Sequence, residues 1–533
     1  MNLRVFVAAA LIGALSLPFA AEERINSDLN SRIREEGMQQ SQLMRTLHFL
    51  TDVYGPRLTG SPSLKAAGEW VVKTMEGWGM KNARLEPWDF GHPGWTNDLA
   101  WGAITSPVKD SLVLEVLAWT PGTKGIVHGK AVNIVIPEQP TADELAAYLG
   151  TVKSKVRGAI VMVGKPRVVP VNITPAPKRN TDEDVKARYD PNNPNAGQRG
   201  RGRGRGQQEP RPGALPAREL AQQIDQFLVD NGALVRVNDA GREHGQIIAF
   251  DNRTYDITKA VPTVVVRNED YGRIARILDD GVPVELEFNI VNRTYPEGRT
   301  AYNTIGEIPG TDKKDEVVML GGHLDSWHSA TGATDNAIGC SIMLEAVRIL
   351  MKLGVQPRRT IRVALWSGEE EGILGSQAYV KEHFGSFEAP KPEYNKLVAY
   401  LNIDTGTGQL RGASVFGPAP AAATLREILA PFQDLGIYGA STSSSRVVAG
   451  TDSTAFSNAG LPGISFQQDP IEYNTHTHHT SLDTYERVIE ADVKKAAVIV
   501  ASTIYHLSMR EEMLARFTAA EMPAPPAPRV SGQ

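Results

Sequence analysis

The chain has 533 residues, of which 41% are hydrophobic and 22% charged, a balance typical of a soluble globular protein with more than one domain. Its 56 Lys and Arg against 61 Asp and Glu give a net charge of −5, which argues against a nucleic-acid partner and against binding to anionic membranes through a basic field. Cys340 is the only cysteine, so no disulfide can form within the chain, and we expect a small buried side chain there.

Residues 1–21 are typical of a secretory signal peptide. A short basic start precedes an apolar segment from Val5 to Leu17, which is too short to span a bilayer comfortably. We therefore expect an exported protein, periplasmic or secreted, without a membrane partner once the signal is removed. Because Pro18 and Phe19 fit a cleavage site poorly, an uncleaved anchor stays an alternative.

Residues 22–124 predict the first part of an α/β domain. A helical lead-in up to Leu50 is followed by a turn-rich loop, Tyr54 to Ser61. Ala67, Val71 and Met75 then recur at the spacing of one helical face. Short apolar runs broken by Pro and Gly, from residue 83 to 117, predict strands.

Residues 125–297 predict an inserted domain, because β-rich runs are separated there by long polar stretches. Within it, residues of about 192–213 carry Arg-Gly repeats that cannot bury a core, so we expect a disordered loop. Arg-Gly repeats can bind RNA. This tract has no aromatic residue and lies in a net acidic chain, which favours a solvated loop without nucleic acid.

Residues 298–510 repeat a strand, a loop and a helix. The apolar runs Val317–Leu320, Ile361–Trp366 and Leu397–Ile403 are each followed by a polar loop and a helical segment. This alternation predicts an α/β fold, a mixed and mainly parallel sheet with helices on both faces. A last helix is expected from Ala491 to Leu507, and the Pro-rich tail, 511–533, should be disordered.

Polar residues follow each of these three strands. His323 and Asp325 come directly after the first, and Asp335 opens the next helix. In open α/β sheets ligands bind beyond the carboxyl ends of the strands, where such side chains converge. Taken alone, this stretch fits a loop histidine and an aspartate helix cap equally well.

Further ligand-type residues accumulate downstream. The second strand leads into three adjacent carboxylates, Glu369 to Glu371, which repel one another unless a cation or proton neutralises them; a solvated acidic turn is the alternative. Asp404 follows the third strand. Three of the 11 histidines, His476, His478 and His479, lie within four positions, a cluster that metal binding explains better than chance.

Together these residues offer two histidines and three carboxylates, five ligands from successive strand ends. Two zinc ions that share one bridging carboxylate require such a set. Each ion then has three protein ligands and keeps a position open for water. One carboxylate of the glutamate pair is left over and suits a general base.

The order and context of these motifs resemble those of the co-catalytic zinc exopeptidases, which include bacterial leucyl aminopeptidases, the glutamate carboxypeptidase type and carboxypeptidase Q. The resemblance covers residues 47–88 and 303–507, and the inserted segment is similar in position to a protease-associated domain. It implies one zinc held by His323, Asp335 and Asp404, and a second held by Asp335, Glu370 and His479. His479 is preferred because it directly precedes the motif Thr480-Ser481-Leu482-Asp483-Thr484. The resemblance also implies Glu369 as the general base and Asp325 as the carboxylate that orients His323.

The resemblance implies an exopeptidase that hydrolyses peptide substrates, and we expect an aminopeptidase. A dipeptidase or a carboxypeptidase stays open, since these branches share the metal ligands and differ in their pockets. A glutaminyl-cyclase-like acyltransferase and a non-catalytic binding protein are alternatives from other classes, and the complete ligand set argues against both. The sequence leaves the oligomeric state open.

Overall fold

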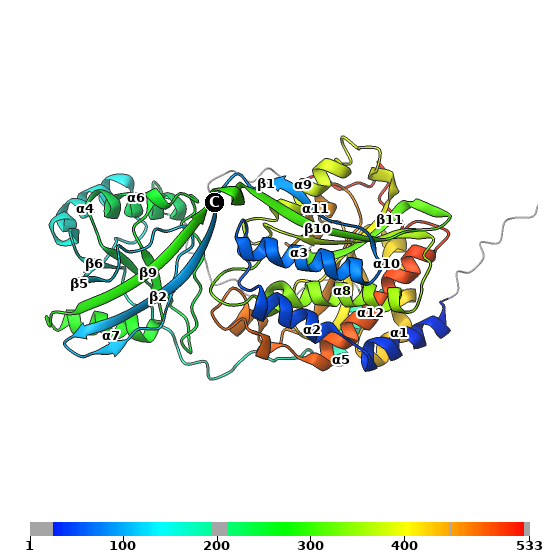
Figure 1. Cartoon of the computed structure of the whole chain (residues 1–533), viewed down its shortest axis with the longest axis horizontal. Helices are drawn as coiled ribbons and strands as arrows, with labels where there is room; N and C mark the ends of the chain where they lie inside the picture. The colour runs from blue at the N-terminus through cyan, green and yellow to red at the C-terminus, as the bar shows by residue number, and fades with distance from the viewer. Residues whose placement is uncertain (1–24, 194–210, 448, 527–533) are drawn as a thin grey trace, which may run out of the picture.

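The computed structural model describes residues 25–193, 211–447 and 449–526. The expected signal peptide, most of the Arg-Gly tract and the end of the tail lie outside these residues. The described chain forms two lobes, side by side in Figure 1, and each is built around an eight-stranded sheet.

The sheet of the first lobe is mixed and mainly parallel. Its four central strands β12, β11, β13 and β16 run parallel to one another, and β15 runs parallel to β14. In spatial order the strands are β1 (Lys81–Asp89), β10 (Thr300–Ile308), β12 (Arg359–Trp366), β11 (Lys313–His323), β13 (Leu397–Asn402), β16 (Gly463–Gln468), β14 (Leu410–Phe416) and β15 (Ala440–Ser443). The three strands predicted from apolar runs are β11, β12 and β13.

Helices cover both faces of this sheet, which confirms the predicted fold class. Along β11, Val318 and Leu320 join the core of one face, whereas Val317 and Met319 join that of the other. The first face carries α1 (Ser27–Gln39), α2 (Leu43–His48), α3 (Pro62–Gly77), α8 (Ile338–Lys352), α10 (Ala419–Leu429) and α12 (Glu490–Met509). The second carries α9 (Leu374–His383) and α11 (Ser453–Asn458).

The second lobe begins ahead of the predicted boundary at residue 125. Strand β2 pairs with β9 along nearly its whole length, so residues from Gly94 onward belong to the second sheet. Its spatial order is β3 (Asp110–Ser111), β2 (Gly94–Ser106), β9 (Glu285–Tyr295), β5 (Val127–Ile134), β6 (Ile160–Val163), β7 (Val235–Asp239), β8 (Thr263–Val266) and β4 (Leu114–Val116). The identification of this lobe as a protease-associated domain stays a prediction.

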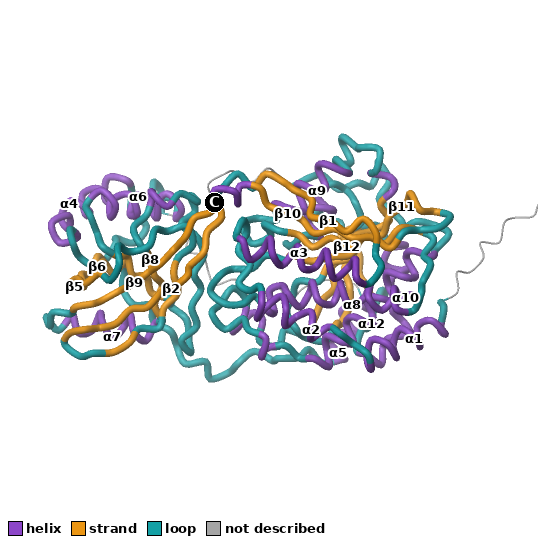
Figure 2. Tube along the Cα trace, in the orientation of Figure 1, coloured by secondary structure: helices purple, strands orange, loops and turns teal. Residues whose placement is uncertain are grey.

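Helices also fill polar stretches of this second lobe, as Figure 2 shows. Helices α4 (Ala142–Val156) and α6 (Ala217–Asp230) pack on one face of its sheet, and α7 (Asn268–Asp279) packs on the other. The lobe is therefore a layered α/β unit rather than a purely β-rich one.

One segment of the predicted insert lies on the first lobe. Helix α5 (Asp182–Tyr189) lies against β14, and its Asp182 pairs with Arg411 of that strand. Just before it, the main-chain carbonyl of Lys178 accepts a hydrogen bond from the Ile471 amide at 2.7 Å. Among the described residues, no helix has the length and apolar character needed to cross a membrane.

Candidate metal centre

The predicted ligands meet at one edge of the first sheet. They follow the carboxyl ends of four neighbouring parallel strands, where open α/β sheets place their ligand sites. Strand β11 ends with the first ligand, the second lies in the loop before α8, and the others come after β12, β13 and β16: His323, Asp335, Glu370, Asp404 and His479.

His323, Asp335 and Asp404 form the first group. The Nε2 atom of His323 lies 3.3 Å from Oδ1 of Asp335 and 3.4 Å from Oδ1 of Asp404. The His323 side chain is fully buried, and the two carboxylates are 4% and 10% exposed. These three side chains could hold one metal ion between them.

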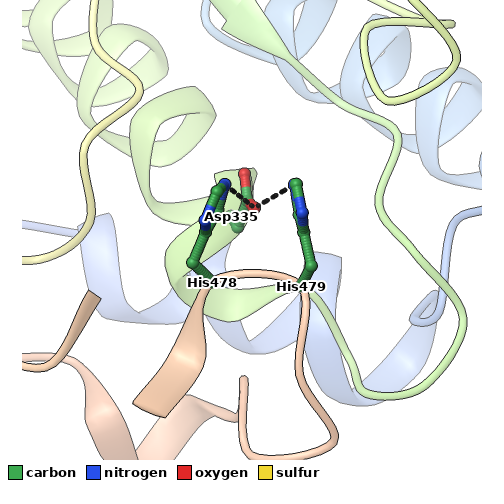
Figure 3. A group of neighbouring side chains, drawn as sticks. All are labelled: Asp335, His478 and His479. Atoms are coloured by element: carbon green, nitrogen blue, oxygen red, sulfur yellow. Dashed lines mark ion pairs between the residues drawn. The ribbon is translucent and has the colours of Figure 1, made fainter. Parts of the chain in front are cut away.

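Asp335 also belongs to the second group. Its Oδ2 atom lies 3.3 Å from Nε2 of His479, and this nitrogen lies 3.0 Å from Oε2 of Glu370. Figure 3 shows His478 and His479 on either side of the Asp335 carboxylate. The Nε2 atom of His478 is 3.8 Å from Asp335, so an alternative group replaces Glu370 by His478. In both versions Asp335 is shared between the two groups.

These distances fit zinc. Two ligand atoms that bind a tetrahedral zinc at about 2.0–2.1 Å are about 3.3 Å apart, longer than an ordinary charged hydrogen bond. Within the described residues, His323 Nε2 and Asp335 Oδ2 are buried without a hydrogen-bond partner. A buried imidazole nitrogen and a buried carboxylate oxygen without partners are costly unless a cation binds them. The residues present therefore fit a zinc site.

The electrostatics of the centre agree with this fit. Burial raises the pKa of Glu370 well above its usual range, and the carboxylate of Asp335 raises it further. Burial acts against a charged His323, yet Asp404 and Glu369 raise the pKa of its imidazole. The concentrated negative charge that contributes to both shifts would stabilise bound cations.

The two other predicted residues lie beside the ligands. Burial raises the pKa of Glu369 well above its usual range; Asp404 raises it further, whereas His323 opposes the shift. The carboxylate of Asp325 lies 3.7 Å from Nδ1 of His323, whereas the main-chain oxygen of Asp325 lies 3.1 Å from the same nitrogen. The hydrogen bond that holds the imidazole therefore comes from the backbone of Asp325, because 3.7 Å exceeds hydrogen-bonding range. The carboxylate accepts instead from Thr59 Oγ1 and the Glu370 amide, both at 3.2 Å.

The structure adds three residues that the sequence had not indicated for this centre. Asp483 accepts the amides of Thr334 and Asp335 at 2.6 and 3.1 Å, so it fixes the backbone that carries the shared ligand. Buried Arg57 donates to carbonyls on both sides of the same loop. Phe250 of the second lobe packs its ring 5.4 Å from that of His479. Of these three residues, only Asp483 had a signal in the sequence, because it lies in the motif that follows His479.

Comparison with known proteins agrees with this arrangement. Residues 303–504 match the model of peptidase family M28. The chain is 27% identical over 484 residues to carboxypeptidase Q of Rattus norvegicus, which covers 90% of this chain and 88% of the relative. It is 32% identical over 225 residues to a probable glutamate carboxypeptidase of Arthroderma benhamiae, covering 37% and 28% of the two chains.

Two solved structures share the fold. A peptidase M28 precursor from Shewanella amazonensis superposes with a TM-score of 0.63 at 22% identity, covering 93% of this chain and 100% of the other. A zinc aminopeptidase from Bacillus subtilis gives a TM-score of 0.55 at 16% identity, covering 90% and 97%. The family match spans all four strands whose ends carry the predicted ligands, and it includes all five ligands. Residues 303–504 are therefore similar to peptidase family M28, which agrees with the resemblance of their motifs to those of the zinc exopeptidases.

Proposed function

We propose that this protein is a zinc-dependent exopeptidase that releases N-terminal residues from peptides. The observation that carries the proposal is the pair of ligand groups that share Asp335, His323 with Asp404 on one side and His479 with Glu370 on the other. A dipeptidase or carboxypeptidase is the second candidate, because relatives aligned over 90% of the chain are named carboxypeptidase Q. The signal-like start leads us to expect that the protein acts outside the cytoplasm.

When bound, two zinc ions would polarise the scissile carbonyl and lower the pKa of a water molecule. In this proposal Glu369 takes a proton from the water that attacks the carbonyl carbon. As the carbon–nitrogen bond breaks, the same carboxyl group gives the proton to the leaving amine. Asp325 and Asp483 touch no reacting atom in this scheme; they hold the backbone and the loop that carry the ligands.

Glu369→Gln tests the role of the base. The amide keeps the shape of the side chain but cannot accept the proton, so kcat should fall by about 10²–10⁴-fold while the zinc content stays that of the wild type. Glu382→Gln, at an exposed position of α9, is the matched control and should keep full activity. Wild-type turnover in the Glu369 variant would remove this residue from the role.

The proposed cleavage site is tested with the same peptide in two forms, with a free and with an acetylated N-terminus. Cleavage confined to the free form supports an aminopeptidase, and equal cleavage of both supports the carboxypeptidase. Loss of cleavage with a chelator and its return with zinc would support the metal dependence. Hydrolysis of either form would exclude the acyltransferase and the binding protein.

A further inference from the structure

Part of the chain between β6 and α6 leaves the second lobe and returns to it. Figure 1 shows β6 and α6 in the second lobe, whereas α5, which lies between them in sequence, packs on β14 of the first lobe. Just ahead of α5, residues 178–180 contact the loop that leads from β16 to His479. We call these three residues the docking segment. A part of the predicted insert therefore touches the loop that carries a metal ligand.

Asp469, the first residue after β16, is at the centre of this contact. Its side chain is 1% exposed, and its Oδ1 accepts hydrogen bonds from the amide and the side chain of Asn180 at 3.0 and 3.1 Å. Its Oδ2 pairs with Nη1 of Arg179 at 3.3 Å, whereas Arg411 of β14 lies 3.5 Å from Oδ1. A buried carboxylate is costly without such partners. Most of the partners that stabilise Asp469 come from the docking segment.

Arg179 also joins this loop to the core of the first lobe. The same Nη1 atom lies 2.8 Å from Oδ2 of Asp492, in the first turn of α12. The Asp492 side chain is 6% exposed, and α12 packs against α8. One guanidinium therefore lies between two buried carboxylates on different elements. Removal of such a cation leaves buried charge without compensation, so the carboxylates would move apart or take up protons.

The docking segment also fixes the residues that follow. The Ile471 amide donates to the Lys178 carbonyl at 2.7 Å, and Nζ of Lys178 donates to Oε1 of Glu472 at 2.6 Å. The carbonyl of Glu472 in turn accepts the amide of His476 at 2.8 Å, within the turn that leads to His479. Contacts thus run without a break from the docking segment to the histidine loop.

Two residues of this turn reach the metal centre. The hydroxyl of Tyr473 lies 3.4 Å from Oδ1 of Asp404, a predicted ligand of the first ion. Oγ1 of Thr477 accepts a hydrogen bond at 2.9 Å from Oγ1 of Thr334, the residue before Asp335. The position of the turn therefore bears on how closely the ligands approach one another.

We propose that Arg179 is a positioning residue for the metal centre, which holds the loop of His479 where the second metal ion requires it. The inference rests on the proposed zinc-dependent function and deepens it, because it assigns part of the metal affinity to the predicted insert. Arg179 acts through Asp469 and Asp492 rather than on the substrate. Contacts outside the ligand shell orient metal ligands, and their loss weakens metal binding by about tenfold to a hundredfold.

Calorimetric titration of metal-free protein with zinc tests this role. The wild type should bind two ions. Arg179→Gln should bind one of them about tenfold more weakly and the other within about twofold of the wild type. Arg179→Lys should recover part of the affinity, because an ammonium group can still pair with one carboxylate. Lys165→Gln, at an exposed position between β6 and the docking segment, is the matched control and should bind both ions as the wild type does.

A purely structural role would lower the stability of the metal-free protein without selecting one ion. Unchanged affinity for both ions in Arg179→Gln would therefore overturn the inference, and so would an equal loss at both. Asn180→Ala is a milder second variant, since it removes one hydrogen bond to Asp469 and keeps the cation. It should weaken the same ion by about twofold to fivefold, as expected for one hydrogen bond to a charged group.

Hydrolysis of a peptide separates this inference from the proposed function. In Arg179→Gln the zinc concentration that gives half-maximal hydrolysis should rise about tenfold, while kcat at saturating zinc stays within about twofold of the wild type. A kcat that stays low at saturating zinc would show that Arg179 acts otherwise than through the metal. Absence of hydrolysis by the wild type would reject the exopeptidase, and the zinc titration would then decide the role of Arg179 by itself.

Discussion

At the scale of single residues, adjacent His478 and His479 both face Asp335 but are not equivalent. His479 lies 3.3 Å from Asp335 and 3.0 Å from Glu370, whereas His478 lies 3.8 Å from Asp335. The side chain of His478 is also the more exposed, 42% against 24%. We therefore expect His479→Ala to lose about one of two zinc ions per chain, because zinc needs ligands at short range, whereas His478→Ala keeps both.

Elemental analysis of the two purified variants checks this prediction, with circular dichroism to establish that both are folded. The two histidines are neighbours in one loop, so each variant controls for the other. Loss of zinc from the His478 variant alone would assign the ligand to His478 and would separate Glu370 from the second group.

Four candidate ligands could be proposed from the sequence because they follow predicted apolar strands, and His479 could be proposed because it lies in a histidine cluster directly before a recognisable motif. Their close approach in space was expected from the rule that parallel strands end at one edge. The contacts of Asp325 could not be foreseen, since its carboxylate is held by Thr59 and the Glu370 amide, which are far away in sequence. Phe250 was missed for the same reason: nothing local marks a residue whose partner lies in another lobe.

At the scale of elements, the loop from β11 to α8 carries His323 at its start and Asp335 near its end. Arg57 fixes its shape from the turn-rich segment near the N-terminus. The guanidinium donates to the carbonyls of Leu324, Thr331 and Gly332 at 2.6, 2.8 and 3.0 Å. The side chain is fully buried, so these hydrogen bonds do not compete with water.

Arg57→Lys should weaken zinc binding and destabilise the fold by about 3 kcal/mol, because an ammonium group cannot reach all of these carbonyls and leaves some unpaired. Zinc titration monitored by calorimetry and urea unfolding at fixed zinc measure the two effects. Arg45→Lys, on the exposed side of α2, is the control and should change neither. Unchanged zinc affinity in the Arg57 variant would show that the loop keeps its shape without the guanidinium.

The elements of the first lobe were predictable where burial leaves a local pattern. Strands β11, β12 and β13 are buried on both faces and read as continuous apolar runs. The second sheet was not delimited correctly, because β2 joins it by pairing with β9, a contact between distant segments that no local pattern reveals. The position of α5 on the first lobe depends on Asp182 and Arg411 in the same way.

At the scale of the whole molecule, the two lobes are joined where the main chains at Gly60, Gly94 and Gly298 approach one another closely. A Cβ atom built on Gly94 would lie 1.9 Å from the Gly60 carbonyl oxygen, and one on Gly298 would lie 2.3 Å from the Gly94 nitrogen. Larger residues at Gly94 or Gly298 would therefore push the backbones apart. Since the chain enters the second lobe near Gly94 and leaves it near Gly298, this crossing holds the second lobe against the first.

The metal centre should couple zinc binding to the stability of the first lobe. Its ligands come from the ends of four strands, so bound zinc links segments that separate on unfolding, while the carboxylates lose their mutual repulsion. Zinc that binds only the folded state at about 100 times its Kd adds about 2.7 kcal/mol to the free energy of unfolding. Removal of the metal with a chelator should lower the thermal midpoint, and added zinc should restore it.

Differential scanning calorimetry with and without chelator measures this shift. Asp335→Asn is the control, because it weakens both ligand groups at once and should make the midpoint insensitive to chelator. A wild-type midpoint that stays the same after verified removal of zinc would mean that the apolar core alone sets the stability of the lobe. The strand ends would then form a preorganised site that gains nothing from its metal, although neighbouring carboxylates add to burial in raising the pKa values of Glu369 and Glu370.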